Sequence, residues 1–151
     1  MTRCTASRGP DVAHTGPIVA LFSKQDAHHE KALAALRSSA GKGQSLCTTW
    51  EVVGEAYTVL RVRLGRQRSA EVALPVLRWA RDSGVHMLPT AQDDHARAAD
   101  LLQRYADHPL SYVDAIVLAI AERHRVGEVI TVDARNFGPV RLAHRLAVTI
   151  V

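Results

Sequence analysis

Residues 112–133 of this 151-residue chain read YVDAIVLAIAERHRVGEVITVD, and this stretch decides the fold class. Residues 112–125 contain an unbroken apolar run, 115–121, which is typical of a helix buried on most of its sides. Residues 128–132 are rich in β-formers and end at Asp133. A buried helix that leads directly into a buried strand predicts a sheet covered by helices.

The same alternation extends over the rest of the chain. Helical spacing of apolar residues predicts further helices at 27–37, 50–64, 66–82 and 91–106, the third kinked at Pro75 unless a fresh turn begins there. Short apolar runs predict strands at 45–48, 85–88 and 147–151. Strands separated by helices imply a parallel sheet with helices on both faces, so we expect an α/β protein. In such sheets, the functional site lies at the carboxyl ends of the strands.

Length and composition indicate one globular domain. A chain that is 47% hydrophobic and 23% charged is not intrinsically disordered. Residues 1–10 lack periodicity, so we expect a disordered or frayed tail there and a single domain over residues 11–151. No apolar run reaches the ~20 residues of a membrane helix and the start lacks a secretory signal, so we expect a cytoplasmic protein without membrane association.

The net charge of +4 comes from the first half of the chain. Residues 1–75 carry 10 basic and 6 acidic side chains, whereas the remainder is balanced. Arginine supplies most of the basic residues, and its guanidinium group binds phosphate in a bidentate manner. The densest basic stretch is Arg61, Arg63, Arg66 and Arg68. These four arginines are candidates for phosphate contacts, and the alternative interpretation is the solvated end of a helix.

Several carboxylates occupy positions where chemistry is expected. Asp133 directly follows a strand, although it could equally begin a turn. Asp114 lies at the start of the buried helix, where Ser111-x-x-Asp114 also fits a capping box. Glu51 fits a capping box with Thr48, and Glu55, one turn later, has no such local role. Carboxylates that converge on one sheet edge suit a hard divalent cation.

None of the G-x-G-x-x-G, P-loop or G-x-S-x-G motifs is present, which leaves nucleotide-cofactor and serine-hydrolase functions unsupported.

Four segments of the chain carry a different set of motifs. They are HTGPIVALF with DAHHE (14–22 and 26–30), CTTW with GEAY (47–50 and 54–57), YADHPLSYVDA with AER (105–115 and 121–123) and ITVDARNF (130–137). In this order, the four segments resemble the PIN-domain family. The resemblance runs from about residue 12 to the end and is greatest to the toxin-type PIN proteins called VapC.

The resemblance implies a fold, a reaction and partners. The fold is a three-layer α/β/α sandwich around a parallel sheet. The reaction is cleavage of RNA by a divalent-metal-dependent endoribonuclease, with Mg²⁺ or Mn²⁺ bound by an acidic cluster. Glu55, Asp114 and Asp133 fall on three acidic positions of the family. A VapB-type antitoxin and a homodimer are the implied partners.

Two positions depart from the family pattern. His14 stands where the first acidic residue is expected, and Asn136 stands where a further Asp is common. The segment before His14, residues 11–13, is poor strand material. Neutral imidazole attracts Mg²⁺ less than a carboxylate does and suits Mn²⁺ or Zn²⁺ better, so His14 is expected to be a poorer fourth ligand. The alternative function is a weakened or inactive PIN domain that binds RNA or protein.

Overall fold

A computed structural model describes residues 9–41, 45–64 and 69–151, without the side chains at 64, 69 and 72. In these residues, five strands form one sheet in the order β3-β2-β1-β4-β5, and every neighbouring pair is parallel. The strands are β1 (Asp11–Ala13), β2 (Leu46–Thr48), β3 (His86–Met87), β4 (Glu128–Thr131) and β5 (Ala147–Ile150). The predicted parallel α/β architecture is therefore confirmed.

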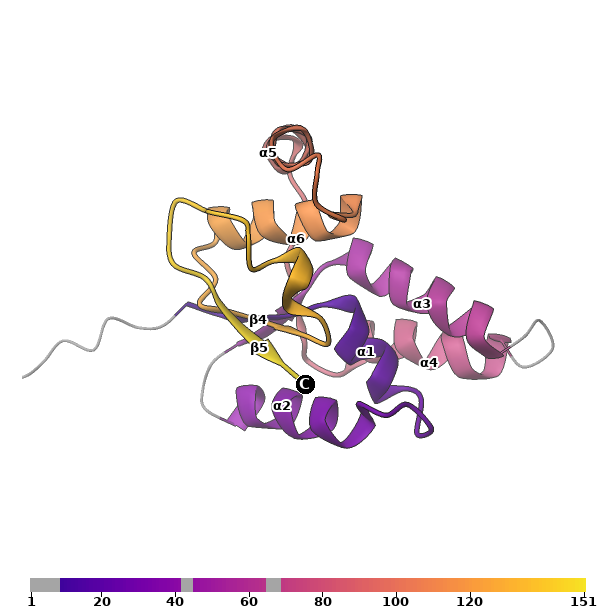
Figure 1. Cartoon of the computed structure of the whole chain (residues 1–151). Helices are drawn as coiled ribbons and strands as arrows, with labels where there is room; N and C mark the ends of the chain where they lie inside the picture. Colours follow the sequence, from indigo (N-terminus) through magenta and orange to yellow (C-terminus); the bar gives the residue numbers. More distant parts are fainter. Residues whose placement is uncertain (1–8, 42–44, 65–68) are drawn as a thin grey trace, which may run out of the picture.

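Helices cover both faces of this sheet. Figure 1 shows α6 above the sheet with α5 outside it, and α2 on the opposite face, while α1, α3 and α4 lie together at one side. The helices are α1 (Thr15–Leu21), α2 (His29–Gly41), α3 (Trp50–Leu64), α4 (Ser69–Asp82), α5 (Gln92–Arg104) and α6 (Tyr112–Arg123), and a 3-10 turn, η1 (Ala134–Asn136), follows β4. In the described residues, no helix is long and apolar enough to cross a membrane.

Helix α6 is the most buried helix, as its apolar run predicts. Residues 114–121 are all at most 3% exposed, so the helix has core on nearly every side. Two ion pairs join α6 to α5, and each helix supplies the arginine of one pair and the carboxylate of the other. Arg97 of α5 binds Glu122 of α6 at 2.9 Å, and Arg123 of α6 binds Asp94 of α5 at 2.8 Å. These pairs fix the position of α6, and hence of Asp114 at its start.

The prediction that residues 11–13 are poor strand material is wrong. They form β1, the central strand, which pairs with β2 on one side and β4 on the other. Val12 and Ala13 are buried, and the Asp11 carboxylate accepts a hydrogen bond from Ser39 Oγ at 2.8 Å. Neighbours on both sides thus stabilise a strand that its own sequence does not favour. Asp11 lies at the amino end of β1, so it cannot replace the acidic residue missing at His14.

Gly16 brings the start of α1 close to the end of β4. A Cβ atom at this position would lie 2.3 Å from a methyl group of Val132, which no real side chain tolerates. The absence of a side chain at Gly16 therefore allows His14 and Thr15 to approach the strand that leads to Asp133.

The remaining helix predictions hold with small shifts in their ends. Helix α4 continues through Pro75, and the predicted start of this helix at Arg66 lies outside the described residues. The short helix α1 is not predicted by periodicity. Residues 1–8 of the predicted tail are also outside the description, whereas the carbonyl of Pro10 accepts a hydrogen bond from Gly127 at 3.0 Å.

Candidate active site

The carboxyl ends of β1 and β4 open into a cavity of about 320 Å³. Helices α1 and α3, which pack against each other, line it together with the loop between α1 and α2 and with the end of β4 and the residues after it. Its polar lining residues are His14, Thr15, Asp26, His28, Glu55, Arg63, Thr131, Asp133 and Asn136. This position agrees with the general rule for parallel α/β sheets.

His14 lies directly against Asp114. Its Nε2 is 2.9 Å from Oδ1 of Asp114, and the two side chains are only 10% and 4% exposed. Nε2 has no hydrogen bond of good geometry among the described residues, so its contact with this oxygen is a close polar approach. The edge of the ring packs against Phe137 with centroids 4.9 Å apart, and the His14 amide donates to the carbonyl of Ile130. These contacts hold the imidazole in place.

Protein donors surround the Asp114 carboxylate. Its Oδ2 accepts from the Ser111 amide at 2.8 Å and from Nδ2 of Asn136 at 3.2 Å. The Asp114 amide donates in turn to Ser111 Oγ at 3.1 Å, which confirms the predicted capping box. Burial by itself raises the pKa of Asp114, but the contacts with His14 and Ser111 outweigh it and leave the pKa below its ordinary value.

Asp133 lies one residue beyond β4 and begins η1. Its carboxylate accepts from the Arg135 amide at 2.9 Å and from Nε of Arg135 at 2.8 Å. Hydrogen bonds from the Arg135 side chain and backbone lower the pKa of Asp133 to about 2. Asp133 therefore begins a turn, as one interpretation predicts, and also lines the cavity, as the other predicts.

One face of α3 forms a wall of the cavity. Glu55, Val59 and Arg63 follow each other at intervals of four residues and all line the cavity. Nη1 of Arg63 donates to Oδ2 of Asp26 at 2.9 Å, which ties the end of α3 to the loop between α1 and α2. Arg61 lies over the Tyr57 ring at 5.8 Å, away from this wall. Arg66 and Arg68 lie outside the described residues.

The predicted capping box of Thr48 and Glu51 is wrong. Thr49 caps α3, because its hydroxyl accepts the Val52 amide at 3.2 Å. Thr48 instead donates across the sheet to the carbonyl of Ala13 at 3.0 Å. Glu51 is left without the predicted role. Its Oε2 is buried and has no hydrogen-bond partner among the described residues.

The residues around the cavity fit a divalent cation in chemistry. Glu55 and Asp133 supply oxygen ligands, and the hydroxyl of Thr15 is buried in the cavity wall without a hydrogen-bond partner among the described residues. His14 and Asp114 are brought together, but protein donors already contact both oxygens of Asp114. In the described part of the chain, no three His, Cys, Asp or Glu side chains converge closely enough to enclose an ion. Metal binding would therefore require side-chain rotation.

Sequence reasoning did not identify three cavity residues, Thr15, Asp26 and His28. Asp26 and His28 lie in the loop between α1 and α2, where no periodic signal distinguishes them. Nδ1 of His28 lies 2.8 Å from the carbonyl of Val151, which joins this loop to the end of the chain. Both residues lie in the segment DAHHE, which resembles the family, and this resemblance is the signal that could have identified them as cavity residues.

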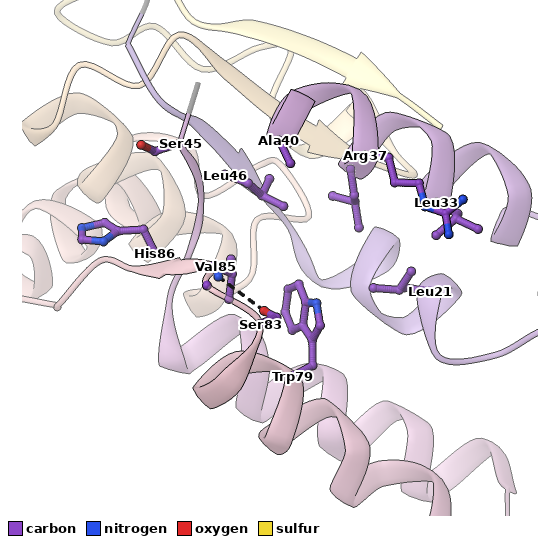
Figure 2. Close-up of a pocket in the computed structure, with 12 residues that line it drawn as sticks. Leu21, Leu33, Arg37, Ala40, Ser45, Leu46, Trp79, Ser83, Val85 and His86 are labelled. Carbon is purple, nitrogen blue, oxygen red and sulfur yellow. Dashed lines mark hydrogen bonds between the residues drawn. The ribbon is translucent and has the colours of Figure 1, made fainter. Parts of the chain in front are cut away.

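A second cavity, of about 510 Å³, lies apart from the first one. Figure 2 shows Leu21, Leu33 and Trp79 around an apolar space between α2 and the end of α4, with Arg37 and His86 at its margins. A dashed line marks the hydrogen bond from the Val85 amide to Ser83 Oγ. None of the described residues that line this cavity carries a carboxylate, so its chemistry differs from that of the candidate active site.

Comparisons with known proteins agree with this geometry. The family model described as the PIN domain matches residues 14–140. Ribonuclease VapC26 of Mycobacterium tuberculosis is 24% identical over 130 residues, which cover 86% of this chain and 91% of that protein. The structure of VapC20 from the same organism, described as a toxin that cleaves the sarcin-ricin loop, has a TM-score of 0.69 at 24% identity and covers 79% of this chain and 86% of that one. VapBC2 from Rickettsia felis, bound to a promoter DNA fragment, has a TM-score of 0.62 at 13% identity, with 91% and 97% covered.

Proposed function

Because the chain belongs to the PIN-domain family, we propose that it is a divalent-metal-dependent endoribonuclease, the toxin of a VapBC-type toxin–antitoxin pair. The observation that carries the proposal is the cavity at the carboxyl ends of β1 and β4, where Glu55 and Asp133 lie beside the pair of His14 and Asp114. Similarity to a VapC ribonuclease supports the same activity.

Glu55, Asp114 and Asp133 would hold Mg²⁺ or Mn²⁺, with His14 as a poorer fourth ligand. When bound, the ion supplies a Lewis acid beside the scissile phosphate. Asp133 is already ionised at neutral pH because the pKa is about 2. His14 replaces an oxygen ligand with a nitrogen, which favours Mn²⁺ over Mg²⁺.

Arginine side chains would contact the RNA backbone. Arg63 lies at the mouth of the cavity with 56% of its side chain exposed, and Asp26 holds its guanidinium group in position. Arg61 is exposed on the same helix. We assign the same role to Arg66 and Arg68 from their place in the basic stretch. Each phosphate contact of this kind adds to the salt dependence of binding.

The proposal also includes a VapB-like antitoxin, a homodimer, a cytoplasmic location and a single domain over residues 11–151. The apolar cavity between α2 and the end of α4 supports a protein partner, because its apolar lining would bury apolar side chains of a bound protein. Complexes of toxin and antitoxin among proteins of similar fold support the antitoxin in particular.

An RNA cleavage assay tests the proposed activity. Purified, antitoxin-free protein is incubated with structured RNAs, one of which carries a sarcin-ricin loop, in Mg²⁺, in Mn²⁺ and in EDTA. We expect cleavage that requires metal, is faster in Mn²⁺, and is lost in Asp133→Asn but kept in Asp107→Asn, an exposed loop residue. Absence of cleavage in both metals by folded protein would refute the enzyme and favour the alternative, an RNA- or protein-binding module.

A further inference from the structure

His28 is a cavity residue to which the proposed site assigns no role. It directly precedes α2 and lines the cavity together with Glu55 and Asp133. Its Nδ1 lies 2.8 Å from the backbone oxygen of Val151. Because such an oxygen only accepts hydrogen bonds, Nδ1 carries the proton in this contact. In the neutral ring, Nε2 is therefore a hydrogen-bond acceptor, and none of the described residues donates to it.

One carboxylate sets the positions of both His28 and Arg63. The Asp26 side chain is only 11% exposed, and its Oδ1 accepts a hydrogen bond from the His28 amide at 2.8 Å. Its Oδ2 accepts from Nη1 of Arg63 at 2.9 Å, and the guanidinium group has further N–H donors that can bind phosphate. Asp26 therefore holds a cation and an imidazole next to each other at the wall of the cavity.

An imidazole acceptor beside a phosphate-binding arginine suits the sugar of a ribonucleotide. When water hydrolyses a phosphodiester, the 2′-hydroxyl group takes no part in the bond changes, so the reaction itself does not distinguish RNA from DNA. The distinction then depends on a contact with the 2′-hydroxyl, which can donate a hydrogen bond. The carboxylates of Glu55 and Asp133 are assigned to the ion, whereas Nε2 of His28 is available to the sugar.

We propose that His28 determines selectivity for RNA, because its Nε2 accepts a hydrogen bond from the 2′-hydroxyl of a nucleotide next to the cleaved bond. This inference rests on the proposed ribonuclease activity and adds to it the residue that recognises the sugar. Asp26 is a positioning residue in this arrangement, since its carboxylate fixes the separation between His28 and the phosphate-binding Arg63.

Two substitutions separate the roles of the two ring nitrogens. His28→Asn keeps an amide N–H near the position of Nδ1, so the bond to Val151 can form while the Nε2 acceptor is lost. His28→Gln places an amide oxygen near the position of Nε2 and so keeps an acceptor. His29→Asn is the matched control. Nδ1 of His29 likewise lies 2.7 Å from a carbonyl oxygen, that of Ala20, but His29 is not among the described residues that line the cavity.

The assay compares an all-ribose RNA with the same RNA carrying one 2′-deoxynucleotide on either side of the cleaved bond, at pH 8, where imidazole is ordinarily neutral. In the parent, we expect one of the two deoxy substitutions to lower kcat/KM by roughly 5-fold, the value of one neutral hydrogen bond. His28→Asn should cleave the all-ribose RNA roughly 5-fold less efficiently, with no further loss from the deoxy substitution. His28→Gln and His29→Asn should both remain sensitive to it.

The results separate this inference from the proposed function. If the parent is sensitive at neither position, or if His28→Asn remains as sensitive as the parent, His28 does not recognise the sugar. A lower melting temperature of His28→Asn with unchanged sensitivity would show that the contact with Val151 is only structural. His28→Leu repeats the comparison without either ring nitrogen, so poor folding of the Asn variant does not decide the outcome. A folded parent that cleaves no RNA would refute the proposed function together with this inference.

Discussion

Replacement of His14 by Asp is the most direct perturbation of the site. In the parent protein, the imidazole lies 2.9 Å from the Asp114 carboxylate, and both side chains are almost fully buried. The variant places two carboxylates in this position. We expect metal-free His14→Asp to be less stable than the parent, and we expect divalent cations to reverse most of that loss.

The magnitude follows from the distance and the burial. Two unit charges at ~4 Å interact by about 4 kcal/mol at the effective dielectric constant typical of proteins. The Ser111 and Asn136 donors to Asp114 remain and absorb part of this repulsion. A net loss of about 2–4 kcal/mol is therefore expected, which lowers the melting temperature by roughly 5–15 °C. Mn²⁺ at a hundredfold excess over its dissociation constant would restore about 2.7 kcal/mol.

The pH dependence of stability gives a second signature. The pKa of Asp114 is lowered in the parent, so its contribution to stability is present above the unfolded value of about 3.9 and is lost as the pH falls below it. In the variant, repulsion raises the pKa of one of the two carboxyl groups, so stability is instead lost as the pH rises through that raised value. The stability difference between parent and variant should therefore be larger at pH 8 than at pH 4.

Calorimetric melting in EDTA and in Mn²⁺, at pH 4 and pH 8, measures these effects. His14→Asn is the matched control, because it removes the ring contact with Phe137 without adding a charge. It should melt below the parent, with no rescue by Mn²⁺. If His14→Asp in EDTA melts with the parent at pH 8, or gains no more from Mn²⁺ than His14→Asn does, the reasoning about this pair is wrong.

Three further predictions concern the surroundings of the site. Arg135→Gln should raise the pKa of Asp133 from about 2 toward its ordinary value near 4, so that most of the stability this group contributes above pH 4 disappears; an NMR titration of the carboxyl carbon measures the pKa. Ser111→Ala should lower the free energy of unfolding by about 1 kcal/mol through loss of the cap on α6, as measured by urea denaturation, and an unchanged midpoint would contradict the capping role. Arg63→Ala should weaken RNA binding and reduce the slope of log affinity against log salt by about one, whereas an unchanged slope would exclude a phosphate contact.

Local patterns in the sequence were sufficient for much of the fold and part of the site. The capping box of Ser111 and Asp114 spans four residues, and Asp133 directly follows its strand, so neighbouring residues determine both positions. The apolar run of α6 likewise determines its own burial. Four of the five strands of the parallel sheet follow from the alternation of such segments.

The predictions that failed concern residues whose structure depends on contacts with distant parts of the chain. Residues 11–13 become the central strand because β2 and β4 pair with them from both sides, which the segment itself does not encode. Thr48 and Thr49 are equally suited to cap a helix, and only the sheet shows that Thr48 is already bonded to Ala13. The contact between His14 and Asp114 joins residues 100 positions apart, so no local pattern could reveal it.

The two ion pairs between α5 and α6 have a consequence for how this region can vary. Arg97 reaches from α5 to Glu122, and Arg123 reaches back from α6 to Asp94, so a slip of either helix by one turn would break both pairs together. The ion pairs, and not the segment that connects the two helices, therefore fix the position of α6 along α5. The exposed residues 106–109 can then accept an insertion without moving the start of α6, so a permissive position for insertion lies a few residues from the candidate active site.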